Sequence, residues 1–90
     1  MNYEPVNNYY ETLVSFELRE QLKEDGRIND MDFLQDVACV ALNKLPPRYV
    51  RHHVDLAYYL TDKEKTEMNN AVSSAVSEAI TFVTRYRERQ

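Results

Sequence analysis

Apolar residues recur at three- and four-residue steps along the first part of the chain, which is the spacing of one helical face. The stripe consists of Val6, Tyr9, Tyr10, Leu13, Val14, Leu18 and Leu22. Pro5 suits the first turn of a helix, and Gly26, the only glycine, suits a C-terminal cap after Asp25. The pattern predicts a helix over roughly residues 5–25, with Phe16 off the stripe, where a partner can contact it.

A second apolar segment covers residues 31–45 and occupies most of a helix circumference in its later part. Asn29 or Asp30 can cap its start, and acidic side chains in the first turn favour the helix dipole. A helix that is apolar nearly all round is usually central, which places Cys39 in the core. Pro46 ends this helix, because the residue before a proline is pushed out of the α region.

Residues 48–60 fit two templates. Alternating apolar positions suit an extended segment, while Val50, Val54, Ala57 and Tyr58 suit one to three helical turns. We expect a short helix here.

The last helix begins at a capping box formed by Thr61 and Glu64 and is expected to run from about residue 62 to about residue 87. Ala71, Ala75 and Ala79 form a small face beside a ridge of Val72, Val76, Ile80 and Val83. A helix of ~26 residues is about 39 Å long, which exceeds the expected span of the remaining domain. We therefore expect part of it to pack on a second copy; the alternative is that the whole stripe serves the core of a single chain.

Composition narrows the class of protein. Ninety residues make one domain, residues 1–90, with a thin core, and few glycines and prolines favour helices over sheet. We predict an all-α domain of three main helices plus a short helical or extended segment, paired as a helix-packed homodimer. The net charge of −4 argues against sequence-independent nucleic-acid binding. No signal peptide and no apolar run approaching ~20 residues is visible, so we expect a cytoplasmic protein without a membrane segment.

Catalytic and metal chemistry find little support in the sequence. His52 and His53 are adjacent, so their side chains diverge, and with Asp55 they would give poor geometry for a tetrahedral ion. No nucleophile motif is present, and Cys39 alone cannot build a disulfide or a multi-thiolate zinc site. We predict a protein that is not an enzyme and carries no metal or cofactor.

The corner after the double proline concentrates cationic and aromatic groups. Arg48, Tyr49, Arg51 and the two histidines fall within six residues. Guanidinium groups match phosphate oxygens and the O6/N7 edge of guanine, and tyrosine offers a stacking face. Rigid proline backbone lowers the ordering cost of binding. An anion site and a solvated charged loop are equally supported by this chemistry.

Two other polar clusters lie at helix ends. At the start of the first helix, Asn8 can read a base edge and Glu11 can accept from guanine N1 and N2, although capping or surface roles are common for such residues. The tail "RYRERQ" places three arginines where they complement the dipole of the last helix. We interpret the tail in that way.

Two stretches, "NYYETLV" (8–14) and "DVACVALNKLPPRYVRHHVDLAYYLT" (36–61), resemble the late competence development protein ComFB family. The pattern A-L-N-x-L-P-P-x-Y matches at Ala41, Leu42, Asn43, Leu45, Pro46, Pro47 and Tyr49. The pattern N-x-x-E-x-L-V matches at Asn8, Glu11, Leu13 and Val14.

The resemblance implies a small all-helical homodimer. Some family members are receptors for cyclic di-GMP, which carries two phosphates and two guanines, and the family name comes from competence for DNA uptake. Some members hold zinc with several cysteines; this chain has Cys39 alone, so that site is not carried over.

Our leading hypothesis is a regulatory protein that binds cyclic di-GMP and signals through an unidentified protein partner. The candidate ligand residues are Arg48, Tyr49, Arg51, His52, Asn8, Glu11 and Asn43, of which Asn43 can equally cap its helix. The alternative is a ligand-free adaptor, linked to competence or motility regulation, that uses Phe16 and exposed tyrosines on a partner. An enzyme on a histidine-bound metal is a distant third.

Overall fold

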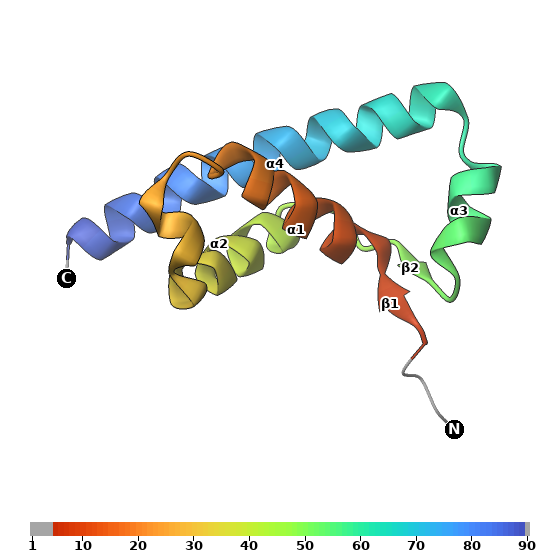
Figure 1. The fold of residues 1–90 in the computed structure, drawn as a ribbon. Helices are drawn as coiled ribbons and strands as arrows, with labels where there is room; N and C mark the ends of the chain where they lie inside the picture. The colour runs from red at the N-terminus through yellow and green to blue at the C-terminus, as the bar shows by residue number, and fades with distance from the viewer. Residues whose placement is uncertain (1–4, 90) are drawn as a thin grey trace.

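A computed structural model describes residues 5–89, without the side chains of Asp55 and Ala57. The elements are β1 (Asn7–Asn8), α1 (Tyr9–Gln21), the 3-10 helix η1 (Gly26–Asn29), α2 (Met31–Asn43), β2 (Tyr49–Val50), α3 (His53–Tyr59) and α4 (Asp62–Glu88) (Figure 1). The expected all-helical class, with a long C-terminal helix, is confirmed; the one addition is a two-stranded sheet of β1 and β2.

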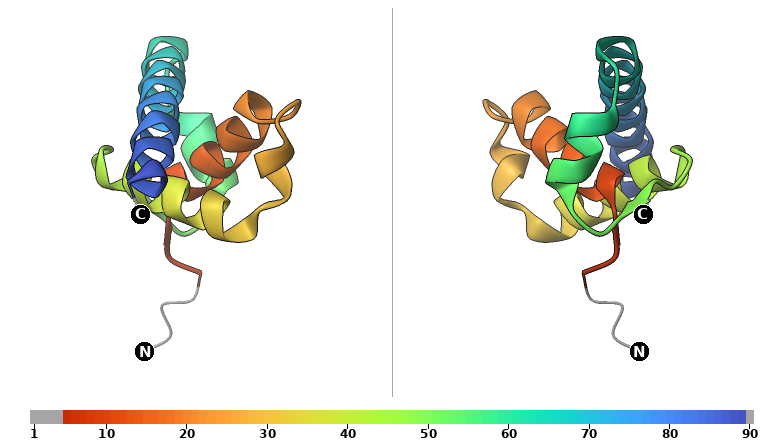
Figure 2. Two further views of the ribbon diagram at one scale, coloured as in Figure 1. Left: turned by 90° about the vertical axis from the view of Figure 1, so that its left-hand side faces the viewer. Right: turned by 90° about the vertical axis from the view of Figure 1, so that its right-hand side faces the viewer.

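The long helix α4 is the axis of the molecule. Its 27 residues span about 40 Å at ~1.5 Å per residue, close to the longest molecular dimension of 42 Å. Helices α1 and α2 cross one side of it, and α3 lies beyond them at its N-terminal end (Figure 1). Viewed along α4, α1 lies to one side and the loop after α2 to the other (Figure 2).

The core forms where α1, α2 and α4 meet. Phe33, Val14, Val37 and Val76 are its largest fully buried side chains. Ala75 and Ala79 are buried with them, so the small face of α4 lets α1 and α2 approach closely within one chain. The buried members of the stripe therefore serve the core of the single chain, and the packing of another part of α4 on a second copy stays a prediction. Of the three alanines, only Ala71 is exposed.

Local capping signals fix the starts of α2 and α4. The Asp30 side chain accepts from the N–H of Phe33 at 3.1 Å. The Thr61 hydroxyl accepts from the N–H of Glu64 at 3.1 Å and donates to the Glu64 carboxylate at 3.1 Å. The Thr61 cap is confirmed, and of the two candidates for the start of α2, Asn29 and Asp30, it is Asp30 that caps. The predicted span of the last helix is confirmed to within a residue or two.

The first helix is shorter than expected at both ends. Asn8 caps it, because the two residues before Tyr9 are held extended by pairing with β2. Pro5 therefore precedes the helix rather than opening it. At the other end α1 stops at Gln21, and Gly26 has no positive φ and begins η1 instead of capping α1.

The second helix buries one face only. Phe33, Val37 and Ala41 face the core, whereas Cys39 is exposed. The expectation of a buried cysteine was wrong because α2 contacts α1 and α4 along one side, and its other side faces solvent. The expected end before the double proline is confirmed, with Lys44 as the C-cap.

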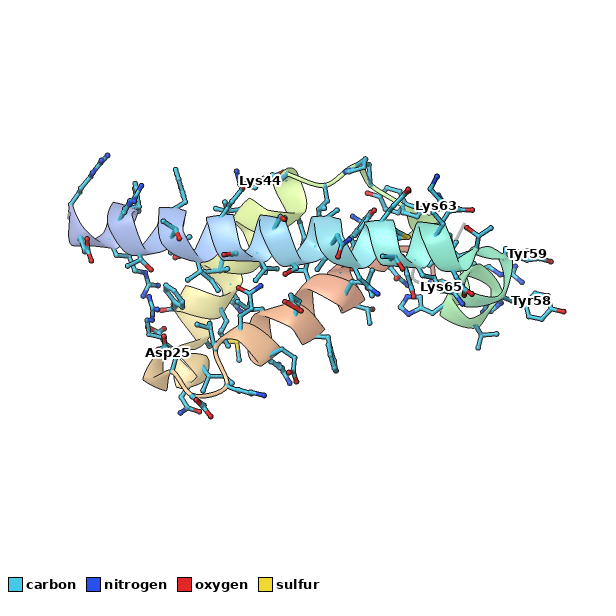
Figure 3. All side chains as sticks on the ribbon, turned by 90° about the horizontal axis from the view of Figure 1, so that it is seen from above. Asp25, Lys44, Tyr58, Tyr59, Lys63 and Lys65 are labelled. Carbon is cyan, nitrogen blue, oxygen red and sulfur yellow. The ribbon has the colours of Figure 1, made fainter. Side chains whose placement is uncertain are left out.

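Arg27 ties η1 to α4. Its guanidinium pairs with Asp25 at 2.8 Å, donates to the Thr84 hydroxyl at 2.7 Å and lies 4.7 Å from the centroid of the Phe33 ring. The labelled Asp25 lies near the turn that leads into η1 (Figure 3). These contacts close the end of the core that the short α1 leaves open.

Arg87 closes the same end from α4. It pairs with Asp30 at 3.1 Å and Asp36 at 3.3 Å, and its guanidinium lies 5.1 Å from the Phe33 centroid. The Phe33 ring is therefore in contact range of two arginines, each neutralised by acids.

Truncation of Phe33 tests this account of the core. We expect Phe33→Ala to lower the free energy of unfolding by about 3–5 kcal/mol, because it empties a fully buried site and removes the surface on which both arginines lie. The half-exposed Phe82→Ala is the control and should change it by less than about 0.5 kcal/mol. Urea unfolding followed by circular dichroism measures both; equal losses would contradict the assignment.

The pKa of Asp25 gives stability a pH dependence. Hydrogen bonds from the Arg27 side chain, and then from its backbone N–H, lower this pKa from 3.8 to about 2. A depressed carboxyl pKa contributes stability above the unfolded value, and this contribution is lost as pH falls through the folded value. Asp25→Asn should therefore be less stable than the wild type near neutral pH. The difference should shrink between about pH 4 and pH 2 in acid-unfolding curves.

Candidate ligand-binding site at the sheet corner

The sheet joins the start of α1 to the cation-rich corner. In the antiparallel pair Asn7 lies opposite Val50 and Asn8 opposite Tyr49. The N–H of Tyr9 also donates to the carbonyl of Arg48 at 2.7 Å. The two segments that carry most of the candidate ligand residues are thus side by side, although 40 positions separate Asn8 from Arg48.

Asn8 holds this junction together. Its side-chain oxygen accepts from the N–H of Tyr10 at 3.2 Å and from the N–H of Arg48 at 3.0 Å. One amide oxygen therefore caps α1 and fixes the backbone at the corner. We assign Asn8 to the frame of the site, since its acceptor oxygen is already used.

The two adjacent histidines have different surroundings. His53 is half-buried, with Nε2 2.8 Å from the Asn7 side-chain oxygen and its ring edge-on to Tyr9 at 5.3 Å. His52 is exposed, and its Nε2 accepts from Nε of Arg51 at 3.1 Å. His53 therefore anchors α3 to the sheet, and His52 faces solvent beside an arginine.

The corner presents its chemistry outward. Arg48, Arg51 and His52 are exposed, and Tyr49 has 67% of its surface accessible. Neither arginine pairs with a carboxylate among the side chains that the structure describes. Among the described side chains, the corner thus combines guanidinium groups that have no carboxylate partner with an exposed aromatic ring, on backbone held by the strand pairing.

Glu11 and Asn43 lie apart from this arrangement. Glu11 is exposed on α1 and lines a groove between α1 and α2 together with Leu18 and Arg19. Asn43 is the last residue of α2 and is exposed, and Lys44, not Asn43, is the C-cap. The contacts described for the corner include neither side chain.

Sequence reasoning missed a second cationic surface on α4. A groove of about 500 Å³ is lined by Lys44 just after α2, by Arg85 and Arg89, and by the aromatic rings of Phe82 and Tyr86. Its one acid, Glu78, pairs with Lys44 at 3.5 Å, so the lining keeps an excess of positive charge. The i, i+4 spacing of the arginines and of the rings was the available signal. The sequence of the tail fits a role of its arginines at the helix dipole and does not show that Lys44, from another segment, lies beside α4 (Figure 3).

The described residues contain neither a cluster of metal ligands nor a membrane-spanning helix. Across residues 5–89, leaving out the two undescribed side chains, no three His, Cys, Asp or Glu side chains gather as metal ligands would. None of the helices in that range combines the length and apolar character needed to cross a membrane.

A scan against protein families gives the family of the chain. The model described as late competence development protein ComFB matches residues 7–87. The chain belongs to the ComFB family. The match runs from β1 almost to the end of α4, and so includes the corner and the α4 groove except for Arg89. Searches of curated proteins and of solved structures returned no match.

The role of Asn8 can be tested by substitution. We expect Asn8→Ala to cost about 1–2 kcal/mol of unfolding free energy, because a helix cap and a bond across the corner are lost together. Asn8→Asp keeps the acceptor and should retain most of the stability. Asn43→Ala is the matched control and should stay within about 0.5 kcal/mol of the wild type in thermal and urea unfolding. If Asn8→Ala is as stable as this control, Asn8 does not hold the corner together.

Proposed function

We propose that this ComFB protein is a regulator that binds cyclic di-GMP at the corner and passes the signal to a protein partner. The observation that carries the proposal is the pair of exposed arginines, Arg48 and Arg51, which have no carboxylate partner among the described side chains and lie beside the exposed ring of Tyr49. In a protein of net charge −4, such a pair is a local site for an anion.

The chemistry of the corner fits the parts of this ligand. A guanidinium fork can bind a phosphate or the O6/N7 edge of guanine, and a tyrosine ring can stack on the base. His52 adds an exposed ring next to Arg51, whose Nε donates to its Nε2 at 3.1 Å. The backbone is already held by Asn8 and the strand pairing, so binding orders little beyond the side chains.

A homodimer forms part of the proposal. Cyclic di-GMP contains two phosphates and two guanines, so a protein with two equivalent corners suits its chemistry. Large apolar side chains also remain exposed on the single chain, among them Phe16 and Met31 on one face.

The second candidate function is a ligand-free adaptor, and α3 favours it. Val54, Tyr58 and Tyr59 are 77%, 86% and 79% exposed on this short helix. The two tyrosines project at the end of the molecule, near Lys63 and Lys65 (Figure 3). A partner that docks there would bury a ready apolar surface without any nucleotide.

Titration with cyclic di-GMP tests the receptor proposal. We expect the wild type to bind, with a thermal shift equivalent to ~2.7 kcal/mol at a ligand concentration ~100 times the dissociation constant. The double variant Arg48→Ala/Arg51→Ala should bind at least about tenfold more weakly, because each arginine contact to phosphate or base is worth roughly 1–3 kcal/mol.

The control is Arg85→Ala/Arg89→Ala, which removes the same two charges from the α4 groove. If only this control loses binding, the receptor function stands and the site lies in the groove. If the wild type shows neither heat nor a thermal shift, the adaptor replaces the receptor.

A further inference from the structure

One exposed row on α1 has the pattern of a surface that pairs with itself. Glu11, Ser15 and Arg19 are exposed and follow one another at i, i+4 and i+8 on the same helical face. The row places an acid at one end, a small residue in the middle and a base at the other end. Among the side chains that the structure describes, neither Glu11 nor Arg19 has an ion-pair partner.

The two charged residues are equally spaced from Ser15, as a two-fold axis that passes beside Ser15 requires. Ser15 lies midway, with each charge about 6 Å away along the helix axis at ~1.5 Å per residue. If a second α1 lies antiparallel across the first, centred on Ser15, each Glu11 meets the Arg19 of the other copy. We propose that this face of α1 is the interface with a second copy of the chain, with two reciprocal Glu11–Arg19 pairs around a close contact at Ser15.

Both flanks of the row supply apolar surface for such an interface. On one side Phe16 is 69% exposed, and on the other Met31 is 59% exposed at the edge of a groove of about 170 Å³. The groove also exposes part of Leu34 and Ala38 from α2. In an antiparallel pair, each flank faces the same flank of the second copy. Phe16 then lies near Phe16 of the second copy, and the apolar side of α2 lies near the same side of the second α2.

The other exposed apolar surfaces suit a second copy less well. The rings of Phe82 and Tyr86 share their groove with Lys44, Arg85 and Arg89 and with one acid, Glu78, which already pairs with Lys44 at 3.5 Å. A self-pairing there brings an excess of positive charges together. The apolar ridge of α4 is already buried inside the single chain. The α1 face, in contrast, combines apolar flanks with one acid and one base that can pair with their own copies.

The inference rests on the homodimer of the proposed function but not on ligand binding. It also assigns Glu11 to the interface instead of the nucleotide site. A failure of the receptor proposal is seen by titration and leaves the interface untouched, whereas a failure of the interface is seen by molecular mass.

A charge swap tests the interface by sedimentation and light scattering across a wide range of concentration. The wild type should be a dimer. Glu11→Arg and Arg19→Glu should each raise the dimer dissociation constant at least about tenfold, because like charges then face each other. The double variant Glu11→Arg/Arg19→Glu should restore it to within about threefold. Glu67→Arg, an exposed reversal on α4, is the control and should remain a dimer.

Two results would overturn the interface: a wild type that is monomeric throughout, or a folded double variant that remains dissociated. Should the charge variants fail to fold, crosslinking at Ser15 answers the same question. In a Cys39→Ser background, Ser15→Cys should give a disulfide-linked dimer under mild oxidation, because residues on the axis are within bonding reach. Ser74→Cys, exposed on α4, should not. Equal crosslinking of the two variants, or none at Ser15, rejects the proposal.

Discussion

The close packing of α4 on α1 and α2 is the constraint on which the rest of this structure depends. Ala75 and Ala79 are buried and small, so the backbones approach closely enough for Val14, Val37 and Val76 to form one core. A domain of this size buries little surface, so few substitutions along this contact can be tolerated. Because α4 is longer than the core, its N-terminal part and α3 extend beyond the contact (Figure 1).

This packing determines how the corner is held. Leu45 is buried at the end of α2, and the double proline follows at once. The chain then pairs with β1, which is continuous with α1. The corner is therefore fixed at one end by the core and at the other by the sheet, and exposed arginines stand on backbone with little freedom.

The arginines of this protein have different roles because their neighbouring side chains differ. Arg27 and Arg87 lie against Phe33 and are paired with acids, so they serve the fold. Arg48 and Arg51 have no such pairing among the described side chains and are exposed. The same contrast separates Arg19 of α1 from Lys23, which follows α1 and pairs with Glu20 at 3.8 Å. Unpaired charges are therefore the places where partners are to be sought.

The sequence by itself determined that three main helices exist, that Thr61 caps the last of them, that Asn29 or Asp30 caps the second and that the second stops before Pro46, and it showed the resemblance to the ComFB family. These depend on residues within about one or two helical turns of each other, where spacing and capping chemistry act directly. Only the tertiary structure decided that α1 begins at Tyr9 and that Cys39 is exposed. It also decided that Asn8 clamps the corner and that Arg85 and Arg89 share a groove with Lys44. Each of these depends on which segments, tens of residues apart, come into contact, and no local pattern contains that information.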